Sequence, residues 1–83
     1  MIHFTKHAEE KFKILKEHKF EISKNQVIET VNSPDLIDYS RSPLLIAQKR
    51  ISSTHIFRVV YKKENNNKII ITFYPGRVKK YEQ

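Results

Sequence analysis

Apolar residues recur at helical spacing near the start of the chain. Ala8, Phe12 and Leu15 fall on one side of a helix, with the polar residues between them on the other. Thr5 stands where its hydroxyl can accept a hydrogen bond from the first helical turn. The pattern therefore predicts a helix from residue 6 to about residue 19.

A second helix has stronger start signals. Ser23 and Gln26 have the spacing of a capping box, in which each side chain binds the backbone N–H of the other residue. Ile22 and Val27 have the spacing of a hydrophobic staple across the same helix start. Because Pro34 disfavours helical geometry at the residue before it, this helix should end at residues 32–34.

The rest of the chain reads as short β-strands separated by turn residues. Such short connections favour antiparallel neighbours. We expect a single α+β domain over residues 1–83, with two N-terminal helices on one face of a four-stranded antiparallel sheet and the other face open. A further short strand at residues 2–4 completes the order β-α-α-β-β-β-β. The four strands are expected at 36–39, 44–51, 55–63 and 68–74, with turns at 41–43, 52–54 and 65–67 and a stop at Pro75-Gly76.

Alternation of side chains along each strand assigns the two faces of the sheet. Gln48 and Arg50 are assigned to the open face, because this sends Ala47 and Ile51 inward. Arg58 alternates with apolar neighbours and is also expected on the open face. The helix-facing core is predicted to hold Phe57, Val59, Tyr61, Ile69, Ile71 and Phe73.

The composition argues against disulfides, metal sites and membrane spans. A chain of 83 residues without cysteine has no disulfide and no thiolate metal site, which fits a reducing compartment. His3, His18 and His55 lack metal-type spacing, so neither a metal nor a cofactor is predicted. The chain has no apolar run of about 18 residues and no signal-peptide core near its start, so we expect a cytoplasmic protein outside the membrane.

Positive charge is concentrated in the second half of the chain. Residues 1–42 carry seven Lys and Arg against seven Asp and Glu, for a net charge of zero. Residues 43–83 carry nine against two, which gives the whole net charge of +7. This split suggests a surface for a polyanion, and the alternative is that the charge only keeps a small basic protein soluble.

Four segments resemble a known family. They are 4–8 (FTKHA), 32–35 (NSPD), 57–61 (FRVVY) and 70–75 (IITFYP). Together they look like a widespread prokaryotic domain that is similar to the RelE and BrnT ribonuclease toxins, and the resemblance covers nearly the whole chain. It implies a microbial-ribonuclease-like fold, metal-free cleavage of RNA, including ribosome-associated mRNA, and an acidic antitoxin protein encoded nearby. The wider group often carries Arg at the position of Lys11.

Metal-free RNA cleavage needs a base for the 2′-hydroxyl, an acid for the leaving 5′-oxygen and cations for the charged transition state. His7, in the first turn of the first helix, is the leading acid or base, and the alternative is a structural histidine. Arg58 is the leading cation, and the alternative is a solvated charge. Tyr74 and Arg77 flank the Pro75-Gly76 stop and complete the candidate catalytic set, although Tyr74 could instead be packing.

Other cations are assigned to RNA binding rather than to chemistry. They are Lys11, Arg50, Lys79 and Lys80. His55 could be a second acid or base, or only a turn residue. Two functions therefore stay open: a toxin-like endoribonuclease, and a non-catalytic RNA-binding or protein-interaction module on the same scaffold. They differ in whether His7, Arg58, Tyr74 and Arg77 meet in one cleft.

Overall fold

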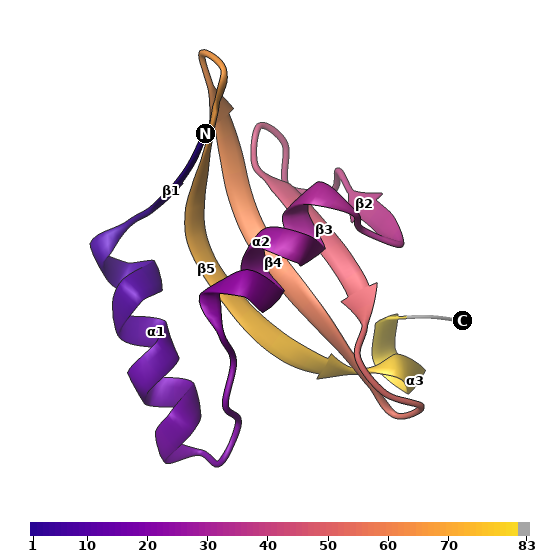
Figure 1. Cartoon of the computed structure of the whole chain (residues 1–83). Coiled ribbons are helices and arrows are strands. Elements are labelled where there is room, and N and C mark those ends of the chain that lie inside the picture. The colour runs from indigo at the N-terminus through magenta and orange to yellow at the C-terminus, as the bar shows by residue number, and fades with distance from the viewer. Residues whose placement is uncertain (82–83) are drawn as a thin grey trace.

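The computed structural model describes residues 1–81 and shows an α+β fold built on a five-stranded sheet (Figure 1). Two helices precede the main strands, in agreement with the predicted element order, and a third, short helix that was not predicted follows them. The elements are β1 (Ile2–Phe4), α1 (Lys6–Glu17), α2 (Lys24–Asn32), β2 (Leu36–Asp38), β3 (Leu45–Arg50), β4 (His55–Glu64), β5 (Asn67–Arg77) and α3 (Val78–Tyr81).

Both predicted helix starts are confirmed. The Thr5 hydroxyl accepts a hydrogen bond from the backbone N–H of Ala8 at 3.1 Å. The capping box of α2 is complete, since Ser23 Oγ accepts from Gln26 N at 3.2 Å and Gln26 Oε1 accepts from Ser23 N at 2.8 Å. These bonds satisfy N–H groups that have no partner inside the helix.

The end of α1 comes two residues earlier than predicted, because the chain turns sharply at Lys19. The N–H of Phe20 donates to Leu15 O at 2.8 Å, and the N–H of Lys19 donates to Lys16 O at 2.9 Å. This is the Schellman arrangement, in which the residue after the cap adopts left-handed geometry. Lys19 has φ 62°, a conformation that glycine adopts at lower cost.

The sheet is mixed rather than purely antiparallel. Its strand order is β1-β5-β4-β3-β2, and β1 pairs with β5 in parallel while the other neighbours are antiparallel. The strand predicted at residues 2–4 is therefore confirmed, and β2 to β5 form the predicted antiparallel meander, but the sheet has five strands rather than four because β1 joins it in parallel. A three-residue strand carries no periodicity that indicates its partner or its direction, so this pairing depends on tertiary structure.

The strand β5 runs through Pro75 and Gly76 to Arg77, so the predicted stop is wrong. Pro75 pairs with Phe57 of β4, whereas β1 pairs only with residues 68–70 of β5. Beyond residue 70, β5 therefore has no strand on its other side. A proline is tolerated at such an edge, because its missing N–H is not needed by a neighbour.

A bulge in the β4–β5 ladder changes which isoleucines reach the core. Val60 pairs with Thr72 and Tyr61 pairs with Ile70, which leaves Ile71 without a pairing partner. The register shift reverses the alternation in β5, so Ile70 is fully buried in the core while Ile69 and Ile71 are only half-buried. The prediction is confirmed for the other four residues, but not for Ile69 and Ile71. The core holds Ala8, Leu15, Ile22, Val27, Val31, Ala47, Phe57, Val59, Tyr61, Ile70 and Phe73.

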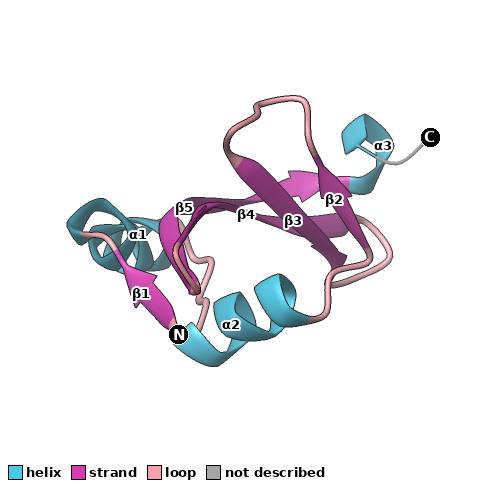
Figure 2. Cartoon of the chain, turned by 90° about the horizontal axis from the view of Figure 1, so that it is seen from above, coloured by secondary structure: helices cyan, strands magenta, loops and turns pink. Residues whose placement is uncertain are grey.

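The face of the sheet opposite α1 and α2 is not open. Ile46, Ile56 and Val60 are buried on it, together with Gln48 and Arg58. Figure 2 shows that the β2–β3 loop and α3 lie on this side of the sheet, across from α2. Both covering segments are short and have no apolar period of their own, so the sequence did not indicate them as a second layer. No helix within residues 1–81 has the length and apolar character needed to cross a bilayer.

Candidate nucleic-acid interface

The four predicted catalytic residues do not share one cleft. His7 is exposed on α1, and Lys11 lies half-buried on the same helix. Arg58 and Tyr74 pair with each other across β4 and β5 on the opposite face of the sheet. Arg77 lies at the far end of β5, exposed to solvent. The structure therefore brings together Arg58 and Tyr74 only.

Arg58 is the centre of a buried polar network. Its Nε donates to Tyr74 Oη at 3.1 Å and one terminal nitrogen donates to Asp38 Oδ2 at 2.9 Å. The other terminal nitrogen donates to Gln48 Oε1. Only 5% of Arg58 is exposed, so the prediction that it projects from an open face is wrong. Its planar fork of donors joins side chains from β2, β3 and β5, which is a structural role.

The network also sets the charge state of its members. Hydrogen bonds from the Ser40 hydroxyl and backbone N–H, and then from Arg58, lower the pKa of Asp38 to about 2. Burial alone would lower the pKa of Arg58, but its bonds to Asp38 and Tyr74 outweigh burial and raise that pKa. Both groups are therefore ionised at neutral pH, and they form a pair that is held by hydrogen bonds.

A different group of cations gathers at one end of the sheet. We call this group the basic end; it lies where β3 ends, β4 begins and β5 runs into α3. Arg77 pairs with His55 across the β4–β5 ladder, and Arg50 lies opposite the next residue of β4. The backbone N–H of Val78 donates to Thr54 O at 2.9 Å, which fixes α3 beside the β3–β4 turn. The members of the basic end are Arg50, His55, Arg77, Lys79 and Lys80.

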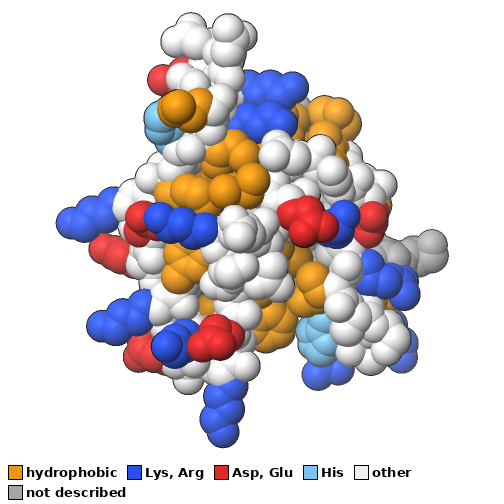
Figure 3. Space-filling model, viewed as in Figure 1, with side chains coloured by type: hydrophobic (Ala, Val, Ile, Leu, Met, Phe, Trp, Pro, Cys, Tyr) orange, Lys and Arg blue, Asp and Glu red, His pale blue; other side chains and the backbone are white. Residues whose placement is uncertain are grey.

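Several side chains of the basic end are accessible. Arg77 and Lys79 line a hollow of about 360 Å³ beside Thr54, and both are exposed. Neither forms an ion pair with another residue between 1 and 81. His55 is half-buried, with Nδ1 2.9 Å from Thr54 Oγ1. Figure 3 shows Lys and Arg side chains beside a histidine at this end, whereas basic and acidic side chains alternate over α1.

Within residues 1–81, no three His, Asp or Glu side chains gather in an arrangement suited to a metal ion. Comparisons with protein-family models, with curated proteins and with solved structures gave no match. The resemblance to the ribonuclease toxins therefore stays a prediction that rests on the segments 4–8, 32–35, 57–61 and 70–75.

Sequence reasoning missed the partners of Arg58. Asp38 and Gln48 lie 20 and 10 residues away from it along the chain, and only the register of β2 and β3 brings them together. The one available signal was that an arginine inside a run of apolar strand residues needs a carboxylate. His55 was considered as a second acid or base, and its position opposite Arg77 follows from the extension of β5 past Pro75.

Proposed function

We propose that this protein binds RNA through the basic end. The observation that carries the proposal is that the ends of β3 and β5 and the start of α3 bring Arg50, Arg77, Lys79 and Lys80 to one end of the molecule. Arg50 and Arg77 are held on strands, and Lys79 and Lys80 on the helix that follows β5, so these cations can bind phosphates with little loss of backbone entropy. The resemblance to ribonuclease toxins is the reason to prefer RNA over other polyanions.

Fluorescence anisotropy with a labelled RNA of mixed sequence tests this proposal. The double variant Arg77→Ala/Lys79→Ala should weaken binding at constant salt by about tenfold or more, because two phosphates are then left without a neutralising cation. The matched control is Lys6→Ala/Lys13→Ala, which removes the same charge from exposed positions on α1. Equal weakening by both double variants would show that only net charge matters, and the basic end would then not be the binding site.

Cleavage of RNA is the second candidate function, and the pairing of His55 with Arg77 is the observation that favours it. His55 could accept the proton of a 2′-hydroxyl while that oxygen attacks the phosphorus, and the bond to the 5′-oxygen breaks as that oxygen takes a proton from water. Arg77 could then stabilise the charged transition state. This arrangement would replace the predicted set of His7, Arg58 and Tyr74, whose members lie on opposite faces of the sheet.

The cleavage assay incubates the protein with RNA in the presence of EDTA and looks for products that end in 2′,3′-cyclic phosphate. His55→Gln should abolish cleavage while it preserves binding, because a glutamine amide cannot accept the proton, whereas the Arg and Lys side chains of the basic end still bind the phosphates. Cleavage that survives in His55→Gln but disappears in His7→Gln would return the acid or base role to His7. A protein that binds RNA and leaves it intact is the non-catalytic module.

A further inference from the structure

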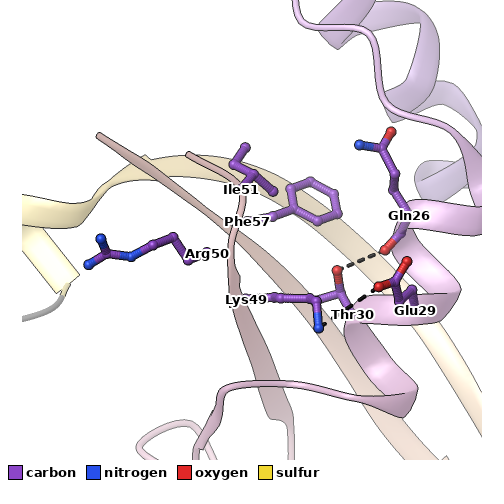
Figure 4. A pocket seen from close by; sticks show the side chains of 7 residues that line it. All are labelled: Gln26, Glu29, Thr30, Lys49, Arg50, Ile51 and Phe57. Carbon is purple, nitrogen blue, oxygen red and sulfur yellow. Dashed lines mark hydrogen bonds and ion pairs between the residues drawn. The ribbon is translucent and has the colours of Figure 1, made fainter. Parts of the chain in front are cut away.

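A groove runs beside the basic end, between α2 and the end of β3. We call it the α2 groove; it consists of two adjoining hollows of about 220 and 350 Å³ that share Gln26 and Ile51. Phe57 closes one hollow from the sheet, and Phe20 borders the other. Figure 4 shows Ile51 and Phe57 on the sheet side, facing Gln26 across the hollow. Apolar side chains line the groove at Phe20, Ile22, Ile51 and Phe57, and the rest of its lining is polar or charged, including the Gln26 amide.

An aromatic pair lies where the α2 groove meets the basic end. The ring centroids of Phe20 and His55 are 6.4 Å apart, and both rings are half-buried. Ile51 is 40% exposed although the strand pattern assigned it to the core, so an apolar surface remains open to a ligand. Aromatic and apolar side chains that keep exposed faces next to cations are the usual platform for unpaired bases.

The charges around the α2 groove favour a ligand that carries phosphate. The carboxylates at its border are both paired, Glu29 with Lys49 at 3.9 Å and Glu21 with Lys16 at 3.8 Å. Arg50 borders the groove, and its side chain extends away from it toward the end of β5 (Figure 4). A base in the groove would therefore leave its phosphate on the side of the basic end.

We propose that the α2 groove holds an unpaired nucleobase of the RNA strand whose phosphates bind the basic end, so that the ligand is single-stranded RNA. This inference rests on the proposed function, since the basic end supplies the phosphate contacts. Gln26 Oε1 accepts the capping bond from Ser23, so its amide offers N–H donors to acceptors on the edge of the base. A paired base in a duplex cannot enter the groove, because its edge and faces are occupied.

The test compares three labelled RNAs of equal length and charge per strand: single-stranded, duplex, and single-stranded with abasic sites. Anisotropy should show that the single strand binds roughly 5- to 100-fold tighter than the abasic strand, as expected for the stacking of a base on an aromatic platform. Ile51→Ser and Phe20→Leu should remove this preference and leave the salt dependence unchanged. Ile14→Ser is the matched control, because Ile14 is 41% exposed on α1, away from the groove.

Because Phe20 also packs against the core, a 2-aminopurine base in the RNA gives a second readout with the parent protein. Its fluorescence should change on binding if the base enters an apolar site. Salt-dependent binding that is equal for the single-stranded and abasic RNAs, with no change in 2-aminopurine fluorescence, would contradict base binding in the α2 groove. The proposal that the basic end binds phosphates would be unaffected. If none of the three RNAs shows salt-dependent binding, the proposal that the basic end binds RNA is wrong, and the proposal that the α2 groove holds a base is wrong as well.

Discussion

At the scale of single residues, Arg58 should control stability rather than RNA binding. Its side chain joins Asp38, Gln48 and Tyr74, and its removal leaves their polar groups without a shared partner inside the protein. We expect Arg58→Ala to lower the free energy of unfolding by about 2–4 kcal/mol, measured by urea denaturation. The exposed Arg41→Ala is the control, and it should change stability by less than about 0.5 kcal/mol. A folded Arg58→Ala that binds RNA more weakly at unchanged stability would instead make Arg58 a docking residue.

Asp38 should make the stability of the protein depend on pH under acidic conditions. Its pKa is about 2 in the folded protein, against 3.8 for an unperturbed carboxyl, so the unfolded state binds the proton more readily. The stabilisation from Asp38 is therefore complete above about pH 4 and is lost as the pH falls toward 2. Unfolding midpoints measured across this range should fall more steeply for the parent than for Asp38→Asn. Parallel pH profiles for the two proteins would contradict the lowered pKa.

At the scale of elements, the turn after α1 holds a residue in an unfavourable backbone conformation that lowers the stability of the fold. Lys19 holds φ 62° in the Schellman turn, where its Cβ is crowded. Lys19→Gly should relieve that crowding and raise the free energy of unfolding by about 0.5–1 kcal/mol after the greater freedom of glycine in the unfolded chain is counted. Lys19→Ala removes the same charge but keeps the Cβ, so it should give no such gain. Equal stabilisation by both variants would assign the effect to charge.

Local signals predicted the helices well because caps act over three or four residues. Ser23 with Gln26, and Thr5 with Ala8, form the expected bonds. The strands were located correctly and the antiparallel pairing of β2 to β5 was predicted, but the parallel partner of β1 and the register shift in β5 were not, because these depend on residues far apart in the chain. The bulge opposite Val60 and the parallel alignment of β1 leave no mark in the alternation, and each changes which side chains reach the core.

At the scale of the whole molecule, the concentration of charge in the second half of the sequence indicated that a basic surface exists, but not which residues form it. Arg50 and Arg77 are 27 positions apart in the sequence, and only the order of β3, β4 and β5 brings them to one end. The expected convergence of His7 with Arg58 failed for the same reason, since α1 packs on the face opposite Arg58. Alternation predicted the face that the core residues of β4 occupy and failed in β5 at the bulge, whereas the end of the sheet at which residues meet could not be predicted from it at all.

An acidic partner protein, implied by the resemblance to toxins, remains a prediction. Such a partner should bind the basic end by charge complementarity and should displace RNA from it. Co-purification from the native host, followed by competition against labelled RNA, measures both properties. A co-purified acidic protein that binds together with RNA would show that it occupies another surface, and recovery of the protein alone would remove support for the partner.

The salt dependence of RNA binding measures how many phosphates the basic end neutralises. Each cation that neutralises a phosphate releases condensed counterions, so the logarithm of the affinity should fall linearly with the logarithm of salt concentration. Lys79→Ala/Lys80→Ala should lower the slope by roughly 0.7 for each phosphate of a single strand that is no longer neutralised, and by the same amount for RNAs of different sequence. Lys6→Ala/Lys13→Ala, with equal charge removed from α1, should leave the slope unchanged. An affinity that stays constant from low to high salt would show that phosphates are not what this surface binds.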